Sequence, residues 1–173
     1  MYHEIDRKFL IQEMPKLSGR KPVLYERYFL QHGDIIEERI QKCGNMYEYE
    51  IKTAISPRER TREKSEITEK EFNKLKAKSS KSILRESYLI SKKNPRMSIN
   101  RYKGDYKGFD FVEVEFDTKE DSESFEPLPW MGTEITNTPI GRDSWLLSLD
   151  REHFLKILDT EQDKLSSDFH SYI

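Results

Sequence analysis

Charged and apolar side chains alternate along several short stretches of the sequence, and this alternation constrains the fold more than any other feature. In the segment 109–117, Glu113, Glu115 and Asp117 alternate with Val112, Val114 and Phe116. The N-terminal segment repeats the pattern with Glu4 and Asp6. A period of two residues is typical of a β-strand whose two faces lie in different environments. The sequence therefore predicts strands with one charged face and one apolar face.

Similar segments recur along the chain, separated by turn-forming residues. They predict strands at 3–11, 25–31, 35–42, 46–52, 83–91, 97–103 and 109–117. Thr68 and Glu71 form a capping-box pair that predicts a helix from there to about residue 76. A short helix is expected over 118–125, and an amphipathic C-terminal helix over about 150–165. Strands that succeed one another with few helices between them favour an antiparallel sheet.

The composition decides how such a sheet closes. Charged residues make up 36% of the chain and hydrophobic ones 35%, which leaves too few apolar side chains for a wholly apolar interior. The like-charged pairs Glu4/Asp6 and Glu113/Glu115 are costly on one strand face unless a cation lies between them. We therefore expect an α+β, mainly β fold: a closed eight-stranded antiparallel barrel with a polar lumen and helices packed outside. Residues 1–173 are expected to form one domain.

The same inventory disfavours several classes of protein. The sequence has no apolar run of membrane-spanning length and no apolar signal-peptide core, so we expect a cytoplasmic protein. Its single cysteine, Cys43, excludes an internal disulfide. The net charge of −2 hides a basic middle and an acidic end. That asymmetry fits either a nucleic-acid-binding arm or one site that binds an anion and a metal, and the scarcity of aromatic residues between the basic ones disfavours nucleic acid.

Four motifs occur in an order that is known from one family. They are Glu4-Ile5-Asp6-Arg7-Lys8, Glu50-Ile51-Lys52, the Gly104/Gly108 hairpin leading into Glu113-Val114-Glu115-Phe116, and the segment 125–136 with its Pro-Trp-Met-Gly-Thr-Glu-Ile-Thr core. Together they resemble the CYTH superfamily, the triphosphate tunnel metalloenzymes that include class IV adenylyl cyclases and thiamine triphosphatases. The resemblance covers residues 3–136 and implies an eight-stranded tunnel that binds a triphosphate and divalent cations.

The resemblance assigns roles to particular residues. The expected phosphate-binding residues are Lys8, Arg39, Lys52 and Arg85, with Lys103 as a further candidate. The expected ligands of Mg²⁺ or Mn²⁺ are Glu4, Asp6, Glu113 and Glu115, whose hard oxygen atoms suit these ions. Accessory or rim positions are expected for Glu63, Glu66, Arg101 and Glu134. The sequence departs from the family pattern at Gln41, Ser87 and Asn100, where the family has two arginines and an aspartate.

The function implied is metal-dependent hydrolysis of a triphosphate: inorganic tripolyphosphate, thiamine triphosphate or a nucleoside triphosphate. The alternatives are a class IV adenylyl cyclase and a non-catalytic polyphosphate or nucleotide binder, and the missing arginines agree with the latter. The expected partner is a small molecule, with no membrane and no nucleic acid. Monomer and homodimer both stay open.

Overall fold

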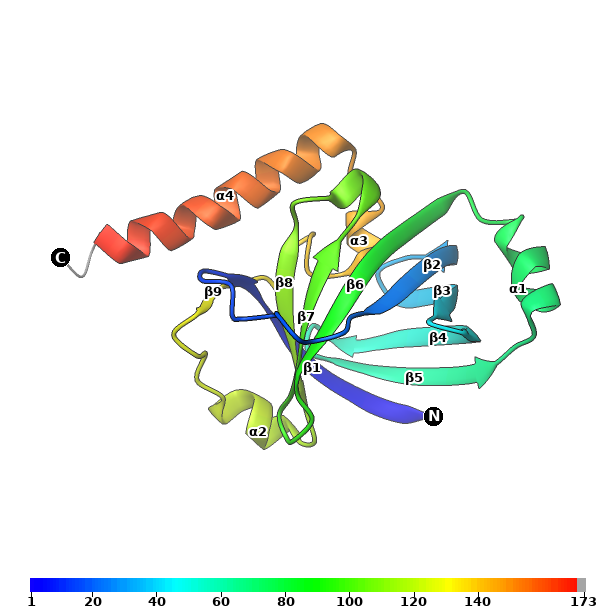
Figure 1. Ribbon diagram of the computed structural model, residues 1–173, viewed down its shortest axis with the longest axis horizontal. Coiled ribbons are helices and arrows are strands. Elements are labelled where there is room, and N and C mark those ends of the chain that lie inside the picture. The colour runs from blue at the N-terminus through cyan, green and yellow to red at the C-terminus, as the bar shows by residue number, and fades with distance from the viewer. Residues whose placement is uncertain (171–173) are drawn as a thin grey trace.

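The computed structural model describes residues 1–170, and the surroundings of side chains as far as residue 164. Nine strands and four α-helices form in this part of the chain (Figure 1). The strands are β1 (Tyr2–Ile11), β2 (Val23–His32), β3 (Ile36–Cys43), β4 (Met46–Ser56), β5 (Glu59–Glu66), β6 (Lys81–Ser91), β7 (Arg96–Tyr102), β8 (Asp110–Phe116) and β9 (Met131–Glu134). The helices are α1 (Glu69–Lys76), α2 (Lys119–Ser124), α3 (Asp143–Leu146) and α4 (Arg151–His170), and a 3-10 turn, η1, covers Gly104–Tyr106.

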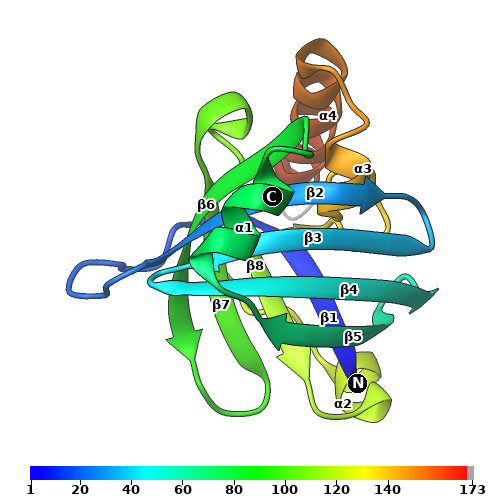
Figure 2. The same ribbon diagram turned by 90° about the vertical axis from the view of Figure 1, so that its right-hand side faces the viewer.

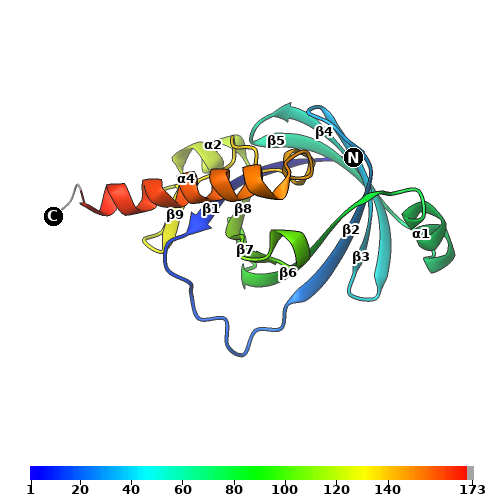
Figure 3. The ribbon, with the colours of Figure 1, turned by 90° about the horizontal axis from the view of Figure 1, so that it is seen from above.

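Eight of the strands described here close into a barrel. Their order is β5-β4-β3-β2-β6-β7-β8-β1, and β5 pairs again with β1 to complete the ring. Every pairing is antiparallel, and β9 lies beside β1 outside the ring. Figure 2 shows β2 to β5 side by side as one wall, and Figure 3 shows the ring from above. The predicted closed antiparallel barrel is confirmed.

The outer face of β1, β7 and β8 is apolar and covered. Phe9, Ile99, Val112 and Val114 are each at most 1% exposed and pack with the segment that leads to Met131. These residues alternate with the charged positions that suggested strands, so each strand presents one face to this core and the other to the lumen. Burial of large apolar side chains outside the barrel is what stabilises a ring whose interior is charged.

One end of the barrel is closed by a second apolar core. Phe29, Tyr102 and Phe111 come from the lumen-facing side of their strands and pack with Leu146 of α3 and Phe154 of α4. Figure 1 shows α3 and α4 together at this end of the barrel. We call this apolar plug the floor of the tunnel. The floor leaves the polar part of the lumen accessible from the opposite end.

The helices predicted near 68–76, 118–125 and 150–165 form as α1, α2 and α4. Thr68 caps α1: its hydroxyl accepts from the Glu71 backbone NH at 3.2 Å, and Glu71 accepts from the Thr68 backbone NH at 2.8 Å. The sequence did not predict β5, β9 or α3. Among the helices described here, none is both long and apolar enough to cross a membrane.

Candidate active site

The lumen holds a cavity of about 370 Å³ above the floor. Of the described side chains that line it, nine are lysine or arginine and five are aspartate or glutamate. The lining therefore carries an excess of four positive charges. An enclosed site with this balance attracts a compact, highly charged anion, because low-dielectric walls strengthen the field within a cleft.

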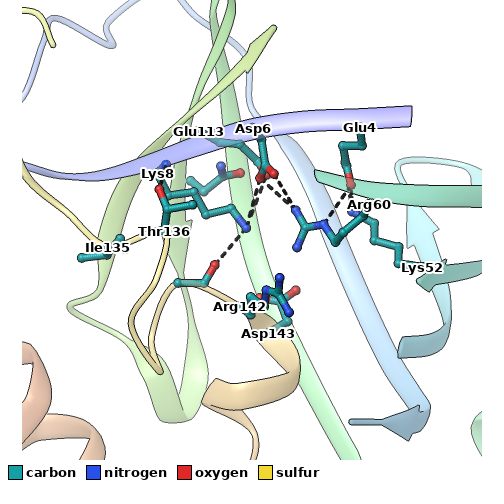
Figure 4. A network of polar contacts seen from close by, with 12 residues as sticks. Glu4, Asp6, Lys8, Lys52, Arg60, Glu113, Ile135, Thr136, Arg142 and Asp143 are labelled. Atoms are coloured by element: carbon teal, nitrogen blue, oxygen red, sulfur yellow. Dashed lines mark hydrogen bonds and ion pairs between the residues drawn. The ribbon is translucent and has the colours of Figure 1, made fainter. Parts of the chain in front are cut away.

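The β1–β8 wall brings together four of the predicted residues. Lys8 lies opposite Glu113 and Asp6 lies opposite Glu115 in the strand register. The Lys8 ammonium lies 3.4 Å from an Asp6 oxygen and 3.6 Å from a Glu113 oxygen, and it donates to the Gly141 carbonyl at 2.9 Å (Figure 4). This lysine therefore stands between two carboxylates, held in place by the loop before α3.

On the other side of β1 from β8, the strands β5 and β4 supply cations to β1. Lys52 donates to both oxygens of Glu4, at 2.7 and 3.0 Å, and the Arg60 guanidinium donates to both oxygens of Asp6, at 2.8 and 2.9 Å (Figure 4). Arg62 adds a third cation beside Glu4 at 3.3 Å. Each predicted carboxylate on β1 is therefore balanced by cations from residues roughly fifty positions away in sequence.

A third group of charges lies near the floor. We call Arg27, Arg39 and Arg85 the arginine cluster. The Asp143 carboxylate accepts from Arg27 at 2.7 Å and lies 3.5 Å from an Arg39 nitrogen. Arg85 differs from its neighbours: it is buried, lies 3.9 Å from a Glu113 oxygen, and donates no hydrogen bond to any described residue. A buried guanidinium that faces a cavity without hydrogen-bond acceptors marks a place where an anionic ligand fits.

Burial and neighbouring charges set the protonation of the carboxylates. Burial, together with the negative charges of Glu113 and Glu4, raises the pKa of Glu115 to about 7. Burial acts on Glu113 in the same direction, but Lys8 and Arg85 outweigh it and hold the pKa of Glu113 well below its ordinary value. The pKa of Glu4 is likewise lowered, against burial, by Lys52 and its neighbouring arginines.

The carboxylates suit a metal that is shared with a ligand. Among the described side chains, no three His, Cys, Asp or Glu residues are grouped closely enough to hold a metal by themselves. Glu115 has no ion-pair partner within 4 Å among the described residues, and burial, followed by the negative charges of Glu113 and Glu4, raises its pKa. Mg²⁺ is usually bound by one or two carboxylates together with substrate phosphates. Glu115 and Glu113 fit that mode.

Comparison with known proteins identifies the architecture. No protein-family model matches the chain, and no curated protein matches it in sequence. Among solved structures it is similar to the inorganic triphosphatase NE1496, with 23% identity, 87% of this chain and 97% of that chain covered, and a TM-score of 0.63. A conserved hypothetical protein from Pyrococcus furiosus is 20% identical over 69% of this chain and 82% of its own, with a TM-score of 0.52. The chain therefore shares the fold of these two proteins.

The three positions at which the sequence departs from the family pattern have different surroundings in the barrel. Gln41 is fully buried, accepts from Arg27 at 3.0 Å and donates to Glu48 at 2.6 Å. Ser87 lines the cavity and leaves space where a longer side chain would reach. Asn100 is fully buried, and its side-chain oxygen has no hydrogen-bond partner in the described structure. Only Ser87 therefore adds room to the lumen.

Several accessory residues expected from the CYTH resemblance do not reach the cavity, and these predictions are corrected. Lys103 and Arg101 lie on the outer face, 43% exposed, and pair with Glu86 and Asp110. The cause is the alternation along β7 and the residue after it. Asn100 faces inward, so Arg101 and Lys103, at odd distances from it, face outward.

The acidic accessory residues also lie elsewhere. Glu63 is exposed and alternates with the inward-facing Arg62. Glu66 is exposed at the end of β5, across from Glu48. Glu134 lies on β9 and holds Arg7 through two hydrogen bonds, of 2.7 and 3.0 Å, outside the cavity lining. Glu134 thus anchors β9 to the barrel.

Other residues that line the cavity were not predicted from the sequence. Arg60 and Arg62 stand on β5, which has no apolar position and was not predicted as a strand. Arg27 stands on a predicted strand, two residues from Tyr25 and Phe29, so its period-two position is the signal that points to the lumen. No signal in the sequence indicates that Asp143 enters the tunnel.

Proposed function

We propose that the protein is a divalent-metal-dependent triphosphatase whose substrate binds inside the barrel. The observation that carries the proposal is the buried Arg85 guanidinium, which has no hydrogen-bond acceptor among the described residues and faces a cavity with an excess of four positive charges. A triphosphate carries about four negative charges near neutral pH, since each phosphoryl group bears at least one. The charge of such a ligand matches the excess in the lining.

The polar residues of the lumen would position the phosphate chain. Lys8, Arg60 and Lys52 come from the neighbouring strands β1, β5 and β4, and each already holds a carboxylate that a phosphate oxygen could replace. Arginine grips such oxygens through two parallel hydrogen bonds, whereas lysine provides a point charge. Phosphoryl transfer depends mainly on positioning and charge stabilisation, which this arrangement supplies without a covalent protein intermediate.

Glu113 and Glu115 are the residues that would hold the metal. A Mg²⁺ or Mn²⁺ ion there would neutralise phosphate charge and lower the pKa of a water molecule for attack on phosphorus. Glu115 is suited to this role because no cation of the described part of the chain lies within 4 Å of it. When the ion leaves, Glu115 can retain a proton near neutral pH, which relieves the repulsion between it and Glu113.

A phosphate-release assay tests the function. Tripolyphosphate, ATP and thiamine triphosphate would each be incubated with the protein and Mg²⁺ or Mn²⁺, with EDTA as the control. We expect metal-dependent release of orthophosphate from at least one substrate, and its loss in both Glu113→Gln and Glu115→Gln. Conversion of ATP to cyclic AMP would instead establish the cyclase alternative. Tight binding of all three compounds without turnover would establish the non-catalytic binder.

A further inference from the structure

A protein carboxylate already occupies one anion-binding position inside the tunnel. Asp143 accepts from Arg27 Nη1 at 2.7 Å through one oxygen and from the Tyr102 hydroxyl at 2.5 Å through the other. Arg39 adds a second guanidinium nitrogen at 3.5 Å. The Asp143 side chain is only 7% exposed and lines the inner end of the cavity. Converging guanidinium and hydroxyl donors are the groups that bind a phosphate.

The segment that carries Asp143 is fixed from both sides. Ile140 and Leu146, which flank it, are at most 1% exposed within the apolar core of the floor. Gly141 lies so close to the Ile135 backbone that an added Cβ would stand 2.0 Å from the carbonyl oxygen. Beyond Asp143, the Trp145 indole donates to the Asp34 carboxylate at 2.8 Å. These contacts hold the Asp143 carboxylate at the inner end of the tunnel.

The members of the arginine cluster differ in whether they donate hydrogen bonds to other side chains. Arg27 donates to both Asp143 and Gln41, and Arg39 donates to Glu37 and Glu50. Arg85 alone in the cluster donates no hydrogen bond to any residue that the structure describes. Arg85 is therefore the member of the cluster that remains available to bind a further anion, on the cavity side of the Asp143 carboxylate.

We propose that Asp143 takes the place of a phosphate group at the innermost position of the tunnel, so that the phosphate chain of a substrate ends at Arg85 and does not reach Arg27. Asp143 is then a specificity-determining residue that sets the inner limit of the phosphate-binding track. The assignment of the track to phosphates rests on the proposed function. The anion position itself is testable without substrate or turnover.

Orthophosphate binding to an Asp143→Ala variant tests the proposal. This change removes the fixed anion and leaves space beside Arg27 and Tyr102, whose donors lose their acceptor. We expect the variant to melt at a lower temperature than the wild type in a phosphate-free buffer. Orthophosphate should bind it at least tenfold more tightly than it binds the wild type, as expected for one recovered charge-assisted contact. At about 100 times its dissociation constant, orthophosphate should raise the melting temperature by about 5–10 °C.

Glu134→Gln is the matched control, because it also removes a carboxylate from an arginine, Arg7, but outside the cavity. Orthophosphate should not stabilise this control more than it stabilises the wild type. Asp143→Asn, which keeps the side-chain volume, serves if the alanine variant does not fold, and it should show the same gain in a smaller measure. Equal phosphate affinity in wild type, control and both Asp143 variants would overturn the proposal. Absence of triphosphate turnover in the wild type would count against the proposed function alone.

Discussion

Replacement of Glu115 by glutamine should stabilise the metal-free protein above neutral pH. Burial and the neighbouring Glu113 and Glu4 raise the pKa of Glu115 from 4.5 to about 7. The folded state therefore holds a proton that the unfolded chain has released. Its free energy of unfolding falls as pH rises from about 4.5 through 7, the sign expected for a raised carboxyl pKa. A shift of this size corresponds to about 3 kcal/mol at pH 8.

The glutamine variant lacks this titration and keeps a neutral side chain at every pH. At pH 8 in EDTA it should be more stable than the wild type by up to about 3 kcal/mol, or about 6–12 °C in melting temperature for a chain of this size. The difference should nearly disappear at pH 4.5. Comparison of the two proteins at each pH removes contributions from the other titratable groups that they share.

Scanning calorimetry from pH 4.5 to 8.5, with and without Mg²⁺, measures both parts of the reasoning. Mg²⁺ should stabilise the wild type at pH 8 and leave Glu115→Gln nearly unchanged, because a neutral amide is a weaker ligand for a hard cation. A variant that is less stable than the wild type at pH 8 in EDTA would refute the assigned electrostatic environment of Glu115. Equal stabilisation of both proteins by Mg²⁺ would refute its role as a ligand.

Three further substitutions test separate parts of the site. Lys52→Ala should weaken tripolyphosphate binding about tenfold or more by calorimetry, and Lys76→Ala on the outer helix α1 should not; equal losses would indicate diffuse electrostatic binding. Ser87→Arg should tighten tripolyphosphate binding by about 1.5–3 kcal/mol because the position lines the cavity. Gln41→Arg should instead lower the free energy of unfolding by about 1–3 kcal/mol because the position is fully buried. Loss of stability in the first variant and tighter binding in the second would contradict the packing. Gly141→Ala should cost about 1–3 kcal/mol of stability in urea denaturation, since its Cβ would meet the Ile135 carbonyl; an unchanged midpoint would show that the loop can move.

The sequence predicted the barrel because most strands have one apolar face that pairs with a core outside the ring. β5 escaped this reasoning because it borders the charged lumen on one face and solvent on the other, and so contains no apolar residue. Its absence from the predicted strands removed Arg60 and Arg62 from the predicted site. The alternation that places Asn100 inward could have excluded Lys103, because residues an odd number of positions apart on a strand face opposite ways.

The floor of the tunnel depends on contacts that no local pattern encodes. α3 has only four residues, and its first, Asp143, meets Arg27 across 116 positions of sequence. The balance of the lumen charges was equally hidden: the missing arginines at positions 41 and 87 agreed with a non-catalytic binder, but Arg27, Arg60 and Arg62 supply cations from other positions. Local periodicity thus reveals which face of a strand is polar, and only the closed barrel shows which polar faces share one cavity.

Diffraction from a crystal soaked with Mn²⁺ and tripolyphosphate would test most directly whether the lumen is the site of triphosphate chemistry. An inactive Glu113→Gln protein would preserve the ligand while Glu115 remains available to the metal. We predict an anomalous manganese peak beside Glu115, with phosphate oxygens bound to Arg85, Lys52 and Arg60 inside the barrel. Phosphates bound only to surface lysines, with an unfilled lumen at saturating ligand, would contradict the proposed function.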